Sequence, residues 1–268
     1  MNTYIVFDIG GTNMRVAAAT DEKLEEIGKI PTPKDPAEAM ARFSELAKSV
    51  SKGAAISAVA GSIRGRVVDG IFLYDKILEA WEGLPIVDTM SRSLGAPVSI
   101  VHDTAAIGVG EVFEGAGRGS KICAYVTVST GVGGDRIIDG KVDITTYNPE
   151  MGRQKVNGID LEDQISGTAI QKKFGIHPKD LESVDERNKL ADILAEGLYN
   201  SALHWVPDTF VVGGSMIIGQ NPIPLERTAA KLREMLVMYP TAPAVKKAEL
   251  GDDGGLRGAR YLAMDMVR

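Results

Sequence analysis

The chain has very little cysteine, and this scarcity excludes several kinds of site. Cys123 is the one cysteine among 268 residues, so neither a disulfide framework nor a zinc site rich in cysteine can be built. Cys123 lies within the apolar run from Ile122 to Val128. We therefore expect it to be buried as a small hydrophobic side chain.

Long apolar runs and clusters of basic side chains are also missing. No run approaches the length of a membrane span, and the first expected strand starts at Tyr4, which leaves no signal peptide. The 30 Lys and Arg residues are scattered and the net charge is −6, so nucleic-acid binding has no electrostatic footprint. We expect a cytoplasmic protein that binds neither nucleic acid nor a membrane.

The first 20 residues have the pattern of a hairpin with a glycine turn. Apolar runs at 4–7 and 16–19 predict two strands, and Gly10-Gly11-Thr12-Asn13 predicts the tight turn between them. Backbone N–H groups of such a turn can approach a phosphate because glycine has no Cβ. Asp8 ends the first strand, where it can hold Mg²⁺ through water. A plain hairpin that ends in an aspartate is the alternative.

A second unit of the same design follows about 120 residues later in the chain. Residues 121–128 predict a strand, 129–134 a glycine-rich turn and 137–142 the returning strand. Two such hairpins indicate a duplicated α/β fold with a cleft between its halves.

The expected lobes are residues 1–103 together with a C-terminal helix at about 256–268, and residues 104–255. The other expected elements that bear on the site are a strand at 54–60 followed by a turn at 61–65, helices at 104–114, 161–174 (broken near Ser166-Gly167) and 225–239, and a last strand at 248–251.

These motifs resemble the ROK family of sugar kinases and regulators, within the actin-like ATPase superfamily. Residues 7–12 and 129–134 are similar to its two phosphate motifs, 212–214 to its adenosine motif and 254–263 to its closing helix. The resemblance implies a two-lobed, actin-like ATPase (ribonuclease H-like) α/β fold that binds ATP and Mg²⁺. It also implies nucleotide contacts from Gly10, Gly11, Thr12, Thr130, Gly131, Gly133, Gly213 and Gly214.

Asp103 lies where the family has its catalytic base. A sugar hydroxyl is a poor nucleophile, and a positioned carboxylate can accept its proton as the bond to phosphorus forms. An aspartate just before a helix is also an ordinary N-cap. The resemblance favours catalysis, and one side chain can serve both purposes.

The sugar contacts that the resemblance implies are Gly65, His102, Asp103, Glu150, Arg153 and Glu162. His102 replaces an asparagine of the family, and Arg153 replaces a histidine that touches sugar and often zinc. The family's cysteine-rich zinc loop is missing, so we predict no zinc. Ser129 and Asp135 replace glycines near the second turn, where Asp135 would add negative charge beside the phosphates.

The predicted function is ATP-dependent phosphorylation of a hexose hydroxyl, with O6 as the expected position and a homodimer as the expected assembly. One alternative is a diverged relative that takes an altered or anionic acceptor or has no catalysis, and His102, Arg153 and Asp135 all motivate it. Arg153 can bind an anionic group of the acceptor or pair with Glu150 instead. A sugar-responsive regulator is a further alternative. It is disfavoured because the chain starts directly in its first strand, without a helix-turn-helix.

Overall fold

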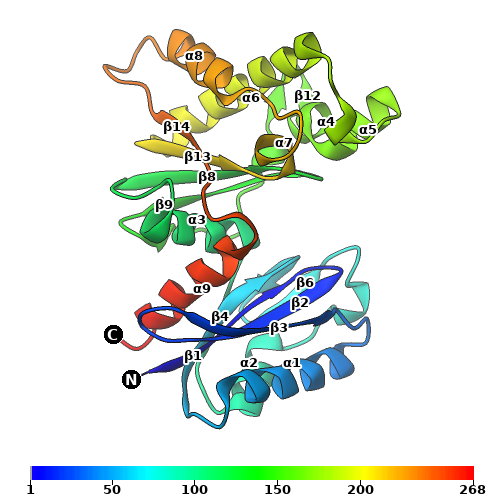
Figure 1. The fold of residues 1–268 in the computed structure, drawn as a ribbon, viewed down its shortest axis with the longest axis vertical. Helices are drawn as coiled ribbons and strands as arrows, with labels where there is room; N and C mark the ends of the chain where they lie inside the picture. Colours follow the sequence, from blue (N-terminus) through cyan, green and yellow to red (C-terminus); the bar gives the residue numbers. More distant parts are fainter. Residues whose placement is uncertain (1) are drawn as a thin grey trace. The chain divides into compact units, whose positions relative to one another are not determined.

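The computed structural model describes residues 2–268, which divide into two compact units. Unit 1 comprises the chain up to Gly110 and Asp252–Arg268, and unit 2 comprises Glu111–Gly251. The boundaries expected from the sequence, 103/104 and 255/256, lie seven and four residues from these. Unit 2 is thus inserted into unit 1 (Figure 1).

Unit 1 is built on a five-stranded sheet in the order β3-β2-β1-β4-β7. Strands β1 (Thr3–Ile9), β2 (Asn13–Ala19) and β3 (Leu24–Pro31) form an antiparallel meander, and β4 (Ile56–Ile63) and β7 (Val98–Val101) run parallel to β1. The predicted opening hairpin is therefore confirmed.

Both faces of this sheet are covered, which explains why β1 reads as one apolar run. Ile5 and Phe7 pack with α1 (Pro36–Ser51) and α2 (Ile86–Leu94), whereas Tyr4 and Val6 pack with α9 (Gly254–Asp265). Figure 1 shows α1 and α2 on one side of the sheet and α9 on the other.

Unit 2 repeats the same sheet order as β10-β9-β8-β13-β14. Strands β8 (Ile122–Val128), β9 (Val132–Ile138) and β10 (Lys141–Val142) are antiparallel, and β13 (Thr209–Gly213) and β14 (Ala244–Lys247) run parallel to β8. The duplicated α/β fold is confirmed by this match of order and direction.

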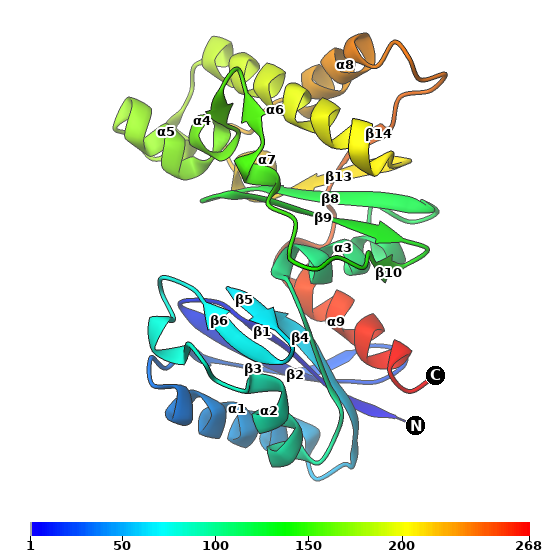
Figure 2. The same cartoon turned by 180° about the vertical axis from the view of Figure 1, so that it is seen from behind.

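One face of the second sheet carries the helices that Figure 2 shows above it. Alternate residues of β8 enter an apolar cluster with these helices, while Cys123 points to the other face and is buried, as predicted. The elements of this layer are α4 (Glu162–Ile165), α5 (Gly167–Phe174), α6 (Val184–Trp205), α7 (Ser215–Ile218) and α8 (Leu225–Met235). The predicted break near Ser166 separates α4 from α5.

Two predicted strand positions are wrong. Strand β4 continues through Gly61 to Ile63, so no turn begins at Gly61. A Cβ at Gly61 would overlap the Phe7 ring and carbonyl, so this glycine allows close packing of β4 against β1. The last strand is Ala244–Lys247, not 248–251. It lies at the sheet edge with three of its four residues exposed, where lysines are tolerated and its apolar pattern is weak.

Helix α8 ends at Met235, earlier than the predicted Tyr239. Tyr239 instead reaches α6, and its hydroxyl donates to the Ala202 carbonyl at 3.3 Å. Short elements complete the fold: α3 (Asp103–Glu114), the hairpins β5 (Arg66–Val68) with β6 (Ile71–Tyr74) and β11 (Lys155–Val156) with β12 (Ile159–Asp160), and 3₁₀ turns at Glu79–Trp81, Met151–Arg153, Pro178–Asp180 and Gly251–Asp253.

Glu111 is a buried carboxylate at the place where the chain enters and leaves unit 2. Its Oε1 accepts hydrogen bonds from the N–H groups of Glu249 and Leu250, both at 2.9 Å. Its Oε2 accepts one from Ala116 N at 2.9 Å. One side chain therefore fastens both ends of the inserted segment.

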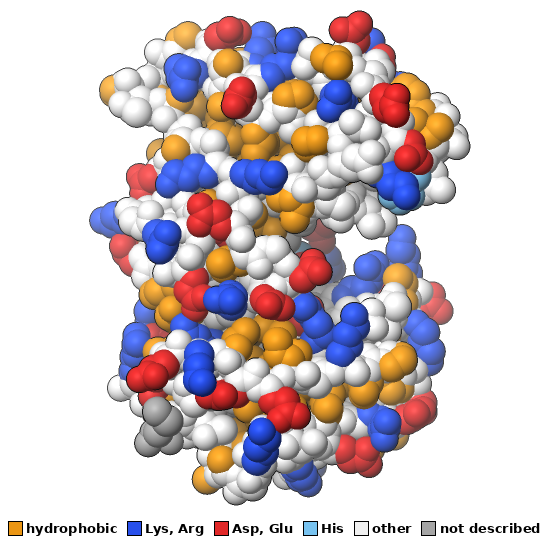
Figure 3. Space-filling model, in the orientation of Figure 1, with side chains coloured by type: hydrophobic (Ala, Val, Ile, Leu, Met, Phe, Trp, Pro, Cys, Tyr) orange, Lys and Arg blue, Asp and Glu red, His pale blue; other side chains and the backbone are white. Residues whose placement is uncertain are grey.

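The surface of each unit mixes charges of both signs. In the face that Figure 3 shows, acidic and basic side chains are interspersed with apolar and uncharged ones. Among residues 2–268, we find no helix that has both the length and the apolar character needed to cross a bilayer.

Candidate functional site

The first glycine turn joins β1 to β2, and its carbonyl groups are bound by the segment that follows β3. Thr32 donates from its hydroxyl to Gly10 O at 2.7 Å and from its N–H to Thr12 O at 2.9 Å, and Lys34 Nζ lies 3.5 Å from Gly11 O. Within residues 2–268, nothing accepts a hydrogen bond from the N–H groups of Gly11 or Thr12. These two donors are available to a ligand.

Gly11 is also required by packing. A Cβ at this position would lie 2.9 Å from Ile77 Cγ2 and 3.4 Å from Arg64 Cδ. Arg64 is held by Asp75, whose Oδ2 accepts from Arg64 Nε at 2.9 Å. The glycine therefore admits the 75–78 loop beside the turn, a role that a phosphate motif alone does not suggest.

Asp8 lies next to the first turn, and both of its carboxylate oxygens are engaged. Oδ2 accepts from Arg15 at 2.8 Å, and Oδ1 accepts from Ser62 Oγ at 2.9 Å. Arg15 also lies 3.7 Å from Asp253. A cross-strand ion pair thus holds the carboxylate that the sequence assigned to Mg²⁺.

These contacts limit how Asp8 could bind a metal ion. A carboxylate oxygen accepts more than one hydrogen bond, so each oxygen can still take one from a metal-bound water. No group of three His, Cys, Asp or Glu side chains in the described part of the chain is arranged to ligate a metal directly. The residues fit a water-mediated Mg²⁺ that the phosphates of a nucleotide would hold, and they do not fit a site made of protein ligands alone.

Asp103 is the first residue of α3, directly after β7 and His102. Its Oδ1 accepts from Thr104 N at 2.8 Å and lies 3.3 Å from His102 Nε2, while His102 Nδ1 lies 2.7 Å from Thr104 Oγ1. Oδ2 has no partner among residues 2–268. Half of the side chain is exposed, so this oxygen can accept a proton.

The carboxyl ends of three neighbouring strands bring Asp8, Ser62 and His102 to one edge of the sheet in unit 1. Asp8 pairs with Ser62 across β1 and β4, and Ser62 pairs with Val101 across β4 and β7. Ligands of open α/β sheets bind outside such an edge. The register therefore groups the predicted catalytic and metal residues.

The second glycine turn joins β8 to β9, and the start of α5 binds its carbonyl groups. Gly167 N donates to Ser129 O at 2.7 Å, and the Thr168 hydroxyl donates to Thr130 O at 2.7 Å. Nothing within residues 2–268 accepts from the N–H groups of Thr130 or Gly131. The second turn therefore presents available N–H donors at the same two positions as the first, the second and third residues after the strand.

Glu162 lies against the second turn. Its Oε2 accepts from Val132 N at 2.9 Å, and a Cβ on Gly131 would lie 2.6 Å from this same oxygen. A side chain at Gly131 would therefore require this carboxylate to move. One predicted sugar residue and one predicted phosphate residue are in direct contact.

Arg153 belongs to an ion-pair network on the β11–β12 hairpin. Its Nη1 lies 3.3 Å from Asp160, and its Nη2 lies 4.0 Å from Glu162. Lys155 is also 2.5 Å from Asp160, and the hydrogen bonds from Lys155 and Arg153 hold the pKa of Asp160 below its usual range. The hydrogen bond to Asp160 raises the pKa of Arg153, so the guanidinium is charged.

Glu150 is the exposed residue before the short turn that carries Arg153, and its carbonyl accepts from Arg153 N at 2.9 Å. The hydrogen bond of the Arg153 side chain goes to Asp160. The β11–β12 hairpin turns through Asn157 and Gly158, both with φ above +50°, as a two-residue hairpin turn requires. This compact hairpin stands where the family's zinc loop was expected.

Gly213 and Gly214, at the end of β13, lie near the end of β8, where the second turn begins. Gly214 has φ +90° and leaves no room for a Cβ beside the Val128 carbonyl. The next residue, Ser215, has its Oγ 3.1 Å from Ser129 Oγ. Gly214 therefore allows α7 to start close to the β8–β9 turn.

The structure also describes the surroundings of Gly133, Asp135 and Gly65. Gly133 pairs with Thr127 inside the β8–β9 ladder, past the turn itself. Asp135 is buried opposite Tyr125, three residue pairs from the pair that closes the turn, which is roughly 10 Å along the strand. The expected crowding of Asp135 with phosphates therefore does not follow from its position. Gly65 has φ +103° and would clash with Phe72, so its conformation is explained by packing.

Four residues of the site were missed from the sequence: Thr32 and Thr168, which bind turn carbonyls, and Arg15 and Ser62, which bind the Asp8 carboxylate. Arg15 had a signal, because a hairpin that pairs Ile9 with Met14 also pairs Asp8 with Arg15. The threonines lie 22 and 38 residues from the carbonyl groups they bind, so no local pattern indicates them.

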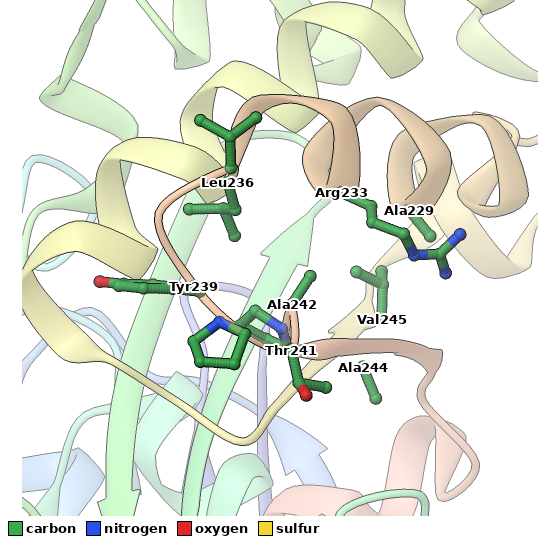
Figure 4. Close-up of a pocket in the computed structure, with 11 residues that line it drawn as sticks. Ala229, Arg233, Leu236, Tyr239, Thr241, Ala242, Ala244 and Val245 are labelled. Atoms are coloured by element: carbon green, nitrogen blue, oxygen red, sulfur yellow. The ribbon is translucent and has the colours of Figure 1, made fainter.

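A hollow of about 640 Å³ in unit 2 lies away from these groups. It is bordered by the end of α8, the 236–243 segment and the start of β14 (Figure 4). Ala244 begins β14 opposite Thr209, the first residue of β13, whereas Gly213 is the last. The hollow is therefore at the amino end of these strands and the glycine motifs are at the carboxyl end.

A model of one protein family, described as the ROK family, matches residues 4–266. The chain belongs to the ROK family. It is similar to a fructokinase from Zymomonas mobilis subsp. mobilis, with 28% identity over 207 residues that cover 69% of this chain and 68% of the relative. This relative is named as a fructokinase.

Two solved structures share the fold. A ROK hexokinase from Thermus thermophilus matches with a TM-score of 0.87 and 23% identity, covering 99% of each chain. A ROK family glucokinase from Streptomyces griseus, in complex with glucose and AMPPNP, matches with a TM-score of 0.76 and 24% identity, covering 98% of this chain and all of the other. They confirm the actin-like α/β fold of this ROK protein.

Proposed function

We propose that this ROK protein is an ATP-dependent sugar kinase that phosphorylates a hexose hydroxyl, with O6 as the expected position. The observation that carries the proposal is the pair of glycine turns, each of which leaves two successive backbone N–H groups without an acceptor among residues 2–268. Such groups bind phosphate oxygens without any side-chain charge. Family membership and the names of the relatives support the sugar as acceptor.

Asp103 is the proposed general base. Its Oδ1 is held by Thr104 N and faces His102, which leaves Oδ2 to take the proton of the acceptor hydroxyl. The hydroxyl oxygen then forms a bond to the terminal phosphorus, the bond from that phosphorus to the bridging oxygen breaks, and ADP leaves. A positioned base of this kind contributes about 10²- to 10⁴-fold to the rate.

The glycine turns and Asp8 are proposed to bind the phosphoryl donor, ATP, with its Mg²⁺. Gly10, Gly11 and Thr12 in one unit, and Thr130, Gly131 and Gly133 in the other, are the proposed phosphate contacts, with Gly213 and Gly214 on the nucleoside side. Asp8 would accept hydrogen bonds from the water shell of Mg²⁺. The ion would supply charge that offsets the developing charge on the phosphate oxygens.

The acceptor is proposed to meet His102, Glu150, Arg153, Glu162 and the backbone at Gly65. Carboxylates accept hydrogen bonds from sugar hydroxyls, so the two glutamates suit a neutral sugar. The second candidate is an anionic acceptor or a chain without catalysis. Arg153 favours the anionic acceptor, because its exposed guanidinium has more donors than its contact with Asp160 uses.

An ADP-release assay over a panel of neutral, N-acetylated and acidic sugars tests the proposal. We expect turnover with at least one hexose and a decrease of at least about 100-fold in Asp103→Asn. Asp88→Asn is the matched control, because Asp88 is an exposed carboxylate in the first turn of α2, as Asp103 is in α3. Full turnover in Asp103→Asn would remove it from the mechanism.

Two further results would redirect the proposal. ATP binding with no turnover on any acceptor would favour a chain without catalysis. Specific retention of duplex DNA in a gel shift would favour a regulator. We also propose a homodimer from family likeness, which light scattering would test.

A further inference from the structure

A threonine hydroxyl binds the same kind of carbonyl in both glycine turns. In unit 1, Thr32 Oγ1 donates to Gly10 O at 2.7 Å. In unit 2, Thr168 Oγ1 donates to Thr130 O at 2.7 Å. Each of these carbonyl groups belongs to the peptide unit that precedes a glycine, Gly11 in the first turn and Gly131 in the second.

The geometry of the peptide unit gives this contact a consequence. A trans peptide is planar, with its C=O and N–H groups on opposite sides. When the Thr32 hydroxyl binds the carbonyl of Gly10, the N–H of Gly11 in the same peptide unit therefore points away from Thr32. The same argument directs the N–H of Gly131, and neither N–H has an acceptor within residues 2–268.

Each hydroxyl acts together with backbone groups of the same segment. Thr32 N donates to Thr12 O at 2.9 Å, and Lys34 Nζ lies 3.5 Å from Gly11 O, so residues 32–34 contact the three successive carbonyls of the first turn. Gly167 N and Thr168 N reach Ser129 O and Thr130 O at 2.7 and 3.4 Å in the second. Successive carbonyls bound on one side leave successive N–H groups together on the other, which is an anion nest.

We propose that Thr32 and Thr168 are positioning residues that orient the two glycine turns toward the phosphoryl chain of the donor. The proposal rests on the proposed function, because it takes the turns as the phosphate site. Thr32 follows a strand and Thr168 starts a helix. The two threonines therefore come from different kinds of element, and they bind different places in the turns: Gly10 is the first residue after β1, and Thr130 is the second after β8.

Calorimetric titration without sugar tests this proposal, with inorganic tripolyphosphate and ATP as separate probes. Thr32→Val and Thr168→Val keep the side-chain shape and remove the hydroxyl. We expect each to raise the Kd of both probes roughly ten-fold, the effect of one hydrogen bond. Thr32→Ser and Thr168→Ser restore the hydroxyl and should stay within about two-fold of the wild type.

Two matched controls separate this role from a general loss of stability. Thr89 Oγ1 donates to Pro85 O at 2.8 Å in unit 1, and Thr228 Oγ1 donates to Ala191 O at 3.2 Å in unit 2. Neither is in contact with a glycine turn. Thr89→Val and Thr228→Val should leave the Kd of both probes unchanged, even where the melting temperature falls.

Several outcomes would overturn the proposal. They are wild-type Kd values in both valine variants, a weakening confined to ATP, and a wild-type chain that binds neither probe. If a valine variant does not fold, an NMR titration of the wild-type protein replaces it. Addition of tripolyphosphate must then shift the amide resonances of Gly11 and Gly131. A wild type that binds both probes but phosphorylates no sugar would refute the kinase function and leave the positioning role intact.

Discussion

Replacing Glu111 with glutamine should destabilise unit 2, although the substitution hardly changes the side-chain shape. The buried carboxylate accepts three backbone hydrogen bonds, two at Oε1 and one at Oε2. Glutamine has one acceptor oxygen and one NH₂ group. The NH₂ group must face either the single donor Ala116 N or the two donors Glu249 N and Leu250 N. Each buried donor left without an acceptor costs about 1–3 kcal/mol.

The arithmetic favours the orientation that keeps two bonds. The amide oxygen then faces Glu249 and Leu250, and Ala116 N loses its acceptor. Loss of that bond and weakening of the other two, which no longer end on a charged oxygen, give a destabilisation of about 2–4 kcal/mol.

Urea unfolding followed by circular dichroism measures this loss. Glu234→Gln is the control, because Glu234 is 70% exposed on α8 and lies 3.6 Å from Lys231. A surface change of this kind should stay within about 0.5 kcal/mol. If Glu111→Gln unfolds within that same margin of the wild type, the three hydrogen bonds do not hold the segment ends as argued.

Three further predictions concern the second unit. Arg153→Met removes the contact with Asp160 and should raise the KM for the acceptor while leaving the KM for ATP unchanged, which initial-rate kinetics would show. Burial raises the pKa of the Cys123 thiol to about 12, so Ellman's reagent should not react with it at pH 8 until denaturant is added. The stability from this protonated thiol is complete below the ordinary thiol pKa of about 8.5 and is lost as the pH rises toward 12, which pH-dependent unfolding would detect. Gly131→Ala should displace the Glu162 carboxylate, 2.6 Å from the new Cβ, and raise both KM values; unchanged kinetics would contradict the contact.

The hairpins and the helix starts were predictable because their signals are local. Asp35 and Pro36 mark the start of α1, and Asp35 accepts from Glu38 N at 2.8 Å as an N-cap does. The register of the first hairpin even places Arg15 opposite Asp8. Such features depend on residues within one or two turns of each other.

The parts that the sequence did not reveal depend on distant partners. Thr32 and Thr168 find their carbonyl groups across other strands and loops, and Gly61 is explained by a ring on the neighbouring strand. The edge strand β14 carries Lys246 and Lys247, which weaken its apolar pattern. Asp103 stays open to both interpretations, because it starts α3 and also keeps one carboxylate oxygen unpaired within residues 2–268.

The hydrogen bonds of the Glu111 carboxylate have a consequence for excision and circular permutation of this protein. Residues 111–251 begin and finish at neighbouring points, since Glu111 is bonded to Glu249 and Leu250. A segment with adjoining ends tolerates excision, transplantation into another host and circular permutation through a short linker. Because Glu111 lies within α3 (Asp103–Glu114), a gene fragment of this segment should start before Asp103 to keep the helix whole, and it would carry one complete glycine turn with its threonine.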